Sequence, residues 1–188
     1  MSRTHARAHA VSAREPWRRV LLIGFMAAGK TTVGAELAVA LGWDFADVDR
    51  ELVRDSGVSV AEFFRLRGEA AFRREESRLT AELCSRERLV LATGGGWPGS
   101  GPGALPPRPA GSAVVWLRVS VAEALRRARL DATLRPLLAD PDPEDTAAAL
   151  LALREPRYRQ ADFTVDVDQR SPADVTHDIV AWLKTSIS

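Results

Sequence analysis

Apolar residues along this chain recur with two spacings, which predicts strands and helices in alternation from residue 20 onward. Strands are indicated at 20–23, 44–48, 89–92, 114–117 and 163–167, where apolar residues form short runs or alternate with polar ones. Helices are indicated at 31–41, 49–55, 59–65, 69–84, 120–129, 143–154 and 172–187. This alternation favours an α/β fold, a parallel sheet with helices on both faces.

Helix boundaries carry signals of their own. The segments 59–62 and 120–123 each begin with serine and end with glutamate, the capping-box pattern in which both side chains bind free backbone N–H groups. Asp142 is the predicted N-cap of the helix that begins at Pro143, where a missing N–H does no harm. Gly68 is expected to separate two successive helices.

Three segments lack such periodicity. The stretch 97–112 is dense in proline and glycine, and 130–141 is also irregular. Residues 1–16 are rich in arginine, alanine and histidine; they could form a transit peptide, but a disordered N-terminal extension is the simpler interpretation. The remainder, 17–188, is the right length for one α/β domain.

Charge and cysteine content narrow the class of protein. The net charge is +1, so the protein has no overall electrostatic field that would attract nucleic acid or a membrane surface. Charge is unevenly distributed, however, because residues 1–19 carry five arginines and one glutamate. Cys84 is the only cysteine, so the chain cannot form an internal disulfide, and a reducing compartment suits it. No apolar run approaches the ~20 residues of a membrane-spanning helix. We therefore expect a cytoplasmic protein without nucleic-acid or membrane partners, and we take it to be a monomer.

The first predicted strand ends in a pattern that binds phosphate. Gly24, Gly29, Lys30 and Thr31 fit G-x-x-x-x-G-K-[ST], whose glycines let backbone N–H groups face phosphate oxygens. The lysine would contact the β- and γ-phosphates, and the threonine hydroxyl would bind Mg²⁺. Only one other lysine, Lys184, occurs among the 26 lysines and arginines, so a lysine at position 30 is not explained by a general abundance of lysine in this chain. The alternative is a strand-to-helix turn that binds nothing.

Acidic residues follow the second predicted strand. Asp47 and Asp49 lie at the carboxyl edge of a parallel sheet, where such folds bind ligands. One carboxylate could support the hydration shell of Mg²⁺ while the other accepts a hydrogen bond from an acceptor hydroxyl. The alternative is that an aspartate here only caps the following helix.

Basic residues in three later segments suit an anionic substrate. They are Arg73, Arg135 and Arg154. Arg73 precedes Glu76 by three residues, and glycines occupy positions 94–96. Paired guanidinium N–H groups can bind a carboxylate or phosphate, although any one arginine alone would be a solvated surface charge. A phosphate loop with such an acceptor side predicts phosphoryl transfer to a small molecule.

In order and spacing these motifs resemble the shikimate kinase family. The resemblance lies in the segments 24–34, 45–49, 57–64, 68–73, 93–96, 135–138 and 154–158, with Ala161 and Asp162. It implies a three-layer, doubly wound, five-stranded parallel sheet of the nucleoside-monophosphate-kinase type with a mobile lid at about 129–142. It also implies transfer of the γ-phosphoryl group of ATP to the 3-hydroxyl of shikimate, with Mg²⁺ required.

The resemblance also implies roles for single residues. The catalytic groups would be Lys30, Asp49 at the acceptor hydroxyl, and Arg135, which the lid closes over the phosphates. ATP would be bound by Gly24, Ala27, Ala28, Gly29, Lys30, Thr31, Thr32, Arg127, Arg135 and Arg170. Shikimate would be bound by Asp49, Arg73, Gly94, Gly95, Gly96 and Arg154, with the two arginines on its carboxylate. Mg²⁺ would be held by Thr31 and, through water, by Asp47.

Two departures from the family pattern bear on this prediction. Relatives often have alanine and a helix after the three glycines, whereas this chain has Trp97, which we expect to narrow the acceptor pocket or wall off one side. Ala27 stands where relatives commonly have glycine, which alanine can replace if its φ stays negative. Two alternatives stay open: a related kinase, for example one acting on gluconate, and a nucleotide-binding module without catalysis.

Overall fold

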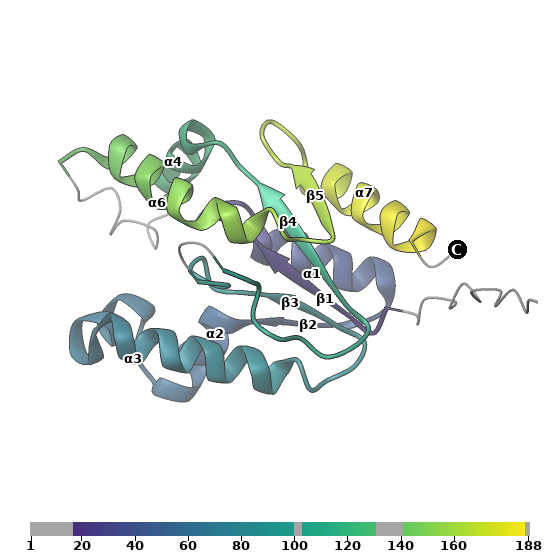
Figure 1. Cartoon of the computed structure of the whole chain (residues 1–188), viewed down its shortest axis with the longest axis horizontal. Helices are drawn as coiled ribbons and strands as arrows, with labels where there is room; N and C mark the ends of the chain where they lie inside the picture. The colour runs from purple at the N-terminus through teal and green to yellow at the C-terminus, as the bar shows by residue number, and fades with distance from the viewer. Residues whose placement is uncertain (1–16, 100–102, 131–140, 187–188) are drawn as a thin grey trace, which may run out of the picture.

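The computed structural model describes residues 17–99, 103–130 and 141–186 (Figure 1). Within these ranges the strands are β1 (Arg19–Ile23), β2 (Asp44–Asp47), β3 (Leu89–Ala92), β4 (Ser112–Arg118) and β5 (Phe163–Asp166). They form one sheet in the order β2-β3-β1-β4-β5, with every neighbouring pair parallel, which confirms the predicted sheet. The predicted N-terminal extension and residues 131–140 of the predicted lid lie outside the described residues.

Helices cover both faces of the sheet, so the fold has three layers (Figure 1). In the described part of the chain they are α1 (Lys30–Leu41), α2 (Val48–Ser56), α3 (Val60–Leu83), α4 (Val121–Leu130), α6 (Pro143–Tyr158) and α7 (Pro172–Thr185). On one face α1 packs beside α7, and on the other α2 packs beside α3. This arrangement is the doubly wound architecture expected from the alternating pattern.

The three central strands β3, β1 and β4 are mainly apolar because both faces of the sheet are buried there. In β1, Val20 and Leu22 join the core that α1 and α7 complete, whereas Leu21 and Ile23 join the core that α2 and α3 complete. All four side chains are at most 1% exposed. The central strand β1 therefore delivers the segment that follows it to the carboxyl edge of the sheet, between β3 and β4.

The long helix α3 is bent at Gly68, as the sequence pattern predicts. The glycine has φ 76° and ψ 168°, which is not helical, and residues on either side continue the helix. Its N-terminus is capped by Ser59, whose Oγ accepts a hydrogen bond from the Glu62 N–H at 3.2 Å. The predicted cap and the predicted break are both confirmed.

The helix α6 begins where the pattern predicts but ends later. The pattern predicts an end at Arg154, but the helix continues through Pro156 to Tyr158. Tyr158 is fully buried, and we attribute the extra turn to that burial, which offsets the backbone hydrogen bond that a proline cannot make. Asp142 occupies the predicted N-cap position and Pro143 begins the helix, so the predicted start is confirmed, although the Asp142 side chain makes no capping hydrogen bond to the helix.

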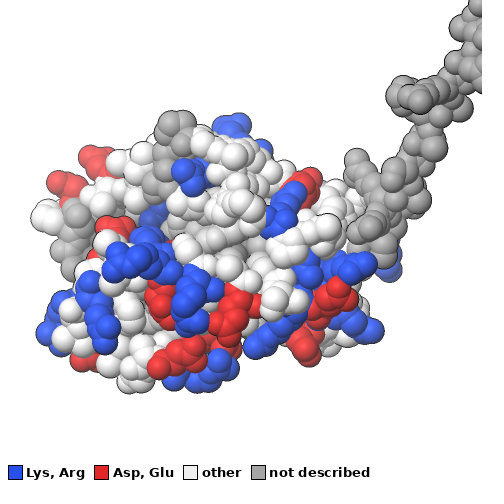
Figure 2. Space-filling view, turned by 60° about the horizontal axis from the view of Figure 1, so that its bottom comes forward, with Lys and Arg blue, Asp and Glu red and all other residues white. Residues whose placement is uncertain are grey.

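The surface mixes charges of both signs. Figure 2 shows acidic and basic side chains side by side on the face brought forward from the bottom of Figure 1. On α3, Arg78 pairs with Glu75 at 2.6 Å and with Glu82 at 2.7 Å, so this arginine is a partnered surface charge. None of the helices in the described ranges has the length and apolar content needed to cross a membrane.

Candidate active site

The loop between β1 and α1 has the conformation of a phosphate-binding loop. Gly24 has φ 147°, and a Cβ built on it would lie 2.5 Å from the Leu117 carbonyl oxygen, so only glycine fits there. The Nζ of Lys30 donates to the carbonyl oxygens of Gly24 at 2.9 Å and Phe25 at 3.0 Å. Burial lowers the pKa of Lys30, while the charges of Asp49 and Asp47 oppose that shift. The lysine is thus held inside the loop, next to two carboxylates.

Ala27 does not keep the negative φ that the sequence analysis required. Its φ is +56°, in the left-handed region that glycine adopts without strain. Its carbonyl oxygen accepts a hydrogen bond from Arg127 Nη1 at 3.3 Å. The loop therefore has at this position the backbone conformation that suits glycine, and Ala27 is strained because its side chain disfavours that conformation.

Replacing Ala27 by glycine should raise the free energy of unfolding by about 0.5–1 kcal/mol. Left-handed geometry costs an alanine roughly 1–2 kcal/mol, and part of the gain is lost because glycine makes the unfolded chain more flexible. Urea unfolding of the unliganded protein measures this difference. Ala28→Gly is the matched control: that methyl group is 1% exposed, so its loss should destabilise the protein. Equal destabilisation by both changes would contradict the interpretation.

Asp47 connects the phosphate loop to α2. Its Oδ2 accepts a hydrogen bond from Thr31 Oγ1 at 2.6 Å. Its Oδ1 accepts hydrogen bonds from the Asp49 N–H at 3.0 Å and the Arg50 N–H at 3.3 Å, so Asp47, rather than Asp49, caps the helix. A hydroxyl and a carboxylate this close form a pair of oxygen donors suited to Mg²⁺, which binds few protein ligands and keeps several waters. The predicted metal residues therefore lie together.

Asp49 lies one residue inside α2, against the glycine-rich turn that follows β3. A Cβ added to Gly94 would lie 3.3 Å from Asp49 Oδ1. Burial, together with the neighbouring charge of Asp47, raises the pKa of Asp49 to about 6, and the charge of Lys30 opposes this shift. A carboxylate with a pKa close to neutral pH is suited to accepting a proton during a reaction.

Arg73 and Glu76 form an ion pair that covers the same turn. Arg73 Nη1 donates to Glu76 Oε2 at 2.8 Å, and the guanidinium lies 5.1 Å from the centre of the Phe72 ring. Glu76 is 2% exposed, and its Oε1 has no hydrogen-bond partner among the described residues. Cβ atoms added to Gly94 and Gly96 would lie 1.9 Å from Glu76 Oε1 and from Arg73 Nη1, respectively. A side chain at either position would therefore displace the ion pair from its place against the backbone.

Arg154 approaches the turn from α6. Its Nη1 donates to the Gly95 carbonyl oxygen at 2.8 Å, and the hydroxyl of Tyr158 donates to the same oxygen at 2.9 Å. Arg154 is 6% exposed, and burial lowers its pKa. Its buried Nε has no partner among the described residues, so one donor of this cation is left for an anion.

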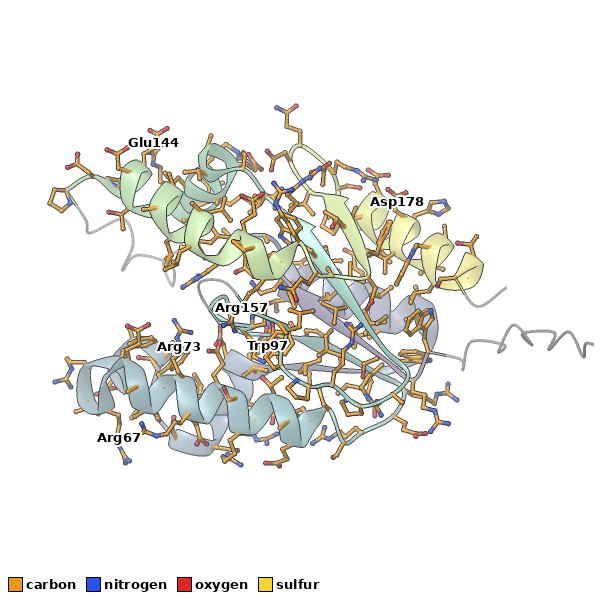
Figure 3. The ribbon with its side chains drawn as sticks, in the orientation of Figure 1. Arg67, Arg73, Trp97, Glu144, Arg157 and Asp178 are labelled. Carbon is orange, nitrogen blue, oxygen red and sulfur yellow. The ribbon has the colours of Figure 1, made fainter. Side chains whose placement is uncertain are left out.

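The charged groups of the two sides lie close enough to influence one another. The charges of Asp49, Arg154 and Glu76 all act on Lys30, and Arg73 acts on Asp49. Arg73 lies on the side of α3 that faces α6, whereas Arg67 points away from it (Figure 3). Residues from the loop after β1, from α2, α3 and α6, and from the turn after β3 thus converge at one edge of the sheet.

Two surface hollows lie away from this cluster. One, of about 330 Å³, is lined by Trp116, Arg118, Leu151, Glu155, Asp166 and their neighbours. The other is an apolar groove between α1 and α7. Neither contains a member of the charged cluster, so the cluster is identified by its side chains and their contacts.

Other predicted site residues have different surroundings. Arg127 contacts the phosphate loop as described, and Arg170 pairs with Asp178 of α7 at 2.9 Å. Thr32 is exposed on α1, and Arg135 lies outside the described residues. Trp97 is 6% exposed and belongs to the hydrophobic core beside α3 and α6, which leaves open its predicted effect on the acceptor.

Two contributions escaped the sequence analysis. Tyr158 was recognised only as part of a motif, yet it shares the Gly95 carbonyl with Arg154. Glu76 was noted beside Arg73 without a role, although its side chain lies against Gly94. The spacing of Glu76 three residues after Arg73 on a helix was the available signal for their pairing.

A phosphate loop at the carboxyl edge of a parallel sheet, facing carboxylates and guanidinium groups, places the protein among the P-loop kinases of small molecules. The sequence profile of shikimate kinase matches residues 26–184. The chain therefore belongs to the shikimate kinase family. Shikimate kinase of Methylococcus capsulatus is 43% identical over 166 residues, which cover 87% of this chain and 90% of that protein. Shikimate kinase of Moorella thermoacetica is 43% identical over 170 residues, covering 88% and 96%.

Solved structures show the same relationship. Shikimate kinase from Acinetobacter baumannii in complex with shikimate matches with a TM-score of 0.78 at 34% identity, over 90% of this chain and 94% of that chain. A gluconokinase from Sinorhizobium meliloti matches with a TM-score of 0.54 at 20% identity, over 93% and 95%. The second likeness concerns the fold alone, so the comparisons favour shikimate kinase over the alternative of a gluconate kinase.

Proposed function

We propose that this protein transfers the γ-phosphoryl group of ATP to the 3-hydroxyl of shikimate, giving shikimate 3-phosphate and ADP. The observation that carries the proposal is the convergence of Asp49, Arg73 and Arg154 beside Lys30, with the buried Nε of Arg154 free of partners among the described residues. A carboxylic acid with a neighbouring hydroxyl matches that arrangement. The related kinase whose structure contains shikimate supports this choice of acceptor.

On the nucleotide side, this chain positions the phosphates. The backbone N–H groups of the loop and the start of α1 face the phosphate oxygens, and Lys30 neutralises charge on the β- and γ-phosphates. Thr31 and Asp47 would hold Mg²⁺, which supplies further positive charge to the phosphates when bound. Arg127 and Arg170 would lie near the adenine, and Arg135, which is outside the described residues, would act on the phosphates.

On the acceptor side, the groups bind and orient shikimate. Arg73 and Arg154 bind its carboxylate, and the Gly95 N–H adds a neutral donor. Asp49 accepts a hydrogen bond from the reacting hydroxyl and takes its proton as the phosphoryl group is transferred. Glu76 holds Arg73 in place through their 2.8 Å hydrogen bond. Tyr158 and Arg154 fix the turn that carries Gly95.

The reaction takes place, in this proposal, in the cytoplasm and within one chain. The single cysteine, Cys84, is buried, which suits a reducing compartment. Every charged group of the cluster comes from the same chain, so a monomer is sufficient for activity. Residues 17–188 would form one domain.

The rate should depend on the ionisation of Asp49. Its pKa is raised to about 6, so the carboxylate is ionised above that pH and protonated below it. Because only the ionised form accepts a proton, kcat/KM for shikimate should fall about fivefold between pH 6 and pH 5, at saturating ATP and Mg²⁺. Asp49→Asn should have low activity, and its kcat/KM should not fall between pH 6 and pH 5. A profile that stays level down to pH 5 would exclude Asp49 as the base.

An acceptor panel tests the proposed function. Purified protein with ATP and Mg²⁺ should convert shikimate with a kcat/KM about 100-fold above that for quinate or gluconate. Phosphorus NMR of the product should place the phosphate on the 3-hydroxyl. Faster turnover of gluconate would move the assignment to a related kinase, and ATP binding without transfer to any acceptor would favour a nucleotide-binding module.

A further inference from the structure

A buried glutamate at the start of α4 does not bind where its motif predicts. The Glu123 N–H donates to Ser120 Oγ at 3.2 Å, which is the first half of a capping box. In the second half the glutamate side chain would accept from the Ser120 N–H, but that N–H donates to Asp168 Oδ1 at 3.0 Å. Glu123 is 9% exposed, so its side chain is largely shielded from solvent. Because the carboxylate does not bind the Ser120 N–H, it can accept hydrogen bonds from other groups.

The Glu123 carboxylate instead binds two successive arginines. Arg126 donates to it from Nε and Nη2, both at 2.7 Å, and the side chain of Arg126 is 61% exposed. Arg127 donates from Nε at 2.7 Å, and its side chain is only 24% exposed. These partners, Arg126 first, lower the pKa of Glu123 to about 2, so the carboxylate stays ionised throughout the range of a kinase assay.

The inner arginine joins three segments of the chain. While Nε of Arg127 binds Glu123 on α4, Nη1 donates to the Ala27 carbonyl of the phosphate loop at 3.3 Å. Its Nη2 donates to the Val167 carbonyl, just after β5, at 2.6 Å. A planar guanidinium held at three edges has a fixed orientation. Arg127 is therefore a bridge between the phosphate loop and the segment after β5, and Glu123 is the only carboxylate among these three contacts.

We propose that Glu123 is a positioning residue of the nucleotide site, acting through Arg127 on the phosphate loop. Without its charge, Arg127 loses its ionic partner, and its long side chain can leave the Ala27 carbonyl for water. Ala27 has a positive φ, so its peptide is held by contacts of this kind rather than by its own preference. Part of the free energy of nucleotide binding would then be used to order the phosphate loop, which weakens nucleotide binding. The inference rests on the proposed function in taking ATP as the nucleotide.

A purely local role of Glu123 would have a different outcome. Pairs between residues three and four positions apart stabilise a helix by small amounts and can be all that Glu123 contributes to α4. In that case removing it would affect Arg126 and Arg127 equally and would change stability without changing nucleotide affinity. The contacts of Arg127 outside α4 favour the positioning role, because Arg126 shares Glu123 but shows no contact with the phosphate loop among the described residues.

The test compares Glu123→Gln with Arg126→Gln. Glu123→Gln removes the charge shared by both arginines and should raise the KM for ATP and the Kd for ADP about tenfold, while kcat and the KM for shikimate change less than about twofold. Arg126→Gln removes only the exposed partner and should leave all four constants within about twofold of the wild type. Binding of ADP is measured by calorimetry and therefore does not depend on which acceptor the enzyme uses.

A double variant separates the bridge from the helix. If Glu123 acts through Arg127, Arg127→Lys should weaken ADP binding, and Glu123→Gln should add less than about twofold on that background. Glu123→Asp, which keeps the charge on a shorter side chain, should recover part of the affinity. Should Glu123→Gln not fold, Arg127→Lys compared with Arg126→Lys provides the same contrast in ADP affinity.

Three results would overturn the proposal. They are equal ADP affinity of Glu123→Gln and Arg126→Gln, additive effects of Glu123→Gln and Arg127→Lys, and a loss of thermal stability in Glu123→Gln with unchanged ADP affinity. A failure of the proposed function would look different, since the wild-type protein would then bind ADP but not phosphorylate shikimate.

Discussion

Lys30→Ala should lower kcat by about three orders of magnitude and leave the affinity for shikimate within about threefold of the wild type. The lysine is enclosed by the phosphate loop, where its Nζ lies 2.9 Å from the Gly24 carbonyl oxygen. From there it meets the charge that develops on the transferred phosphoryl group, whereas the acceptor carboxylate is bound by the two arginines. Steady-state kinetics with ATP and shikimate, and calorimetry with shikimate alone, measure the two quantities.

Lys184→Ala is the control for this change, because Lys184 is the only other lysine and is exposed at the end of α7. Its replacement should leave both constants unchanged. Turnover of Lys30→Ala within tenfold of the wild type would show that the phosphate loop does not supply the main charge stabilisation. An equal loss of shikimate affinity would show that the nucleotide and acceptor sides are not separate.

Arg154→Ala should raise the KM for shikimate about 100-fold and change the KM for ATP little. The variant loses a buried, charge-assisted contact to the acceptor carboxylate, while Tyr158 keeps its hydrogen bond to the Gly95 carbonyl. Because burial lowers the pKa of Arg154, its removal should not reduce the stability of the unliganded protein much. Kinetics at varied shikimate concentration, together with a thermal unfolding curve, test both parts.

Arg159→Ala is the matched control at the C-cap of α6. Its side chain is 68% exposed and pairs with Glu155 at 2.7 Å, so its loss should leave the KM for shikimate unchanged. If Arg154→Ala lowered kcat but kept the KM for shikimate, the arginine would act on the transferred group and not on the acceptor carboxylate. Arg73→Ala is a less direct test, because it also leaves the buried carboxylate of Glu76 without its cation.

Most of the architecture could be predicted from the sequence because its signals are local. The strand Leu89–Ala92 was predicted with its observed bounds, and Ser59 and Gly68 act where the pattern places them. The end of α6 could not be predicted in this way. A proline normally marks the end of a helix, and what extends this one is the burial of Tyr158 against another part of the chain.

The candidate site shows the same division between local and long-range signals. The phosphate loop and the acidic pair were identified from spacing, and Thr31 and Asp47 do form a hydrogen bond. A negative φ was the condition for alanine at position 27 because only its own side chain was considered, whereas the loop around Ala27, with its contact to Arg127, has a positive φ there. The capping-box pattern also gave the wrong partner for the side chain of Glu123. The Ser120 N–H donates instead to Asp168, which lies 48 residues after Ser120 in the sequence.

The crowding at Gly94 and Gly96 limits how this enzyme can be redesigned. Even a methyl group at either position would displace the ion pair of Glu76 and Arg73, so variants of these two glycines should bind the acceptor less well. Variation at Gly95 meets nothing closer than the Met26 backbone nitrogen, at 3.7 Å. Selection for new acceptors should therefore proceed through the middle position of the turn and the neighbouring helices, with its two outer positions held constant.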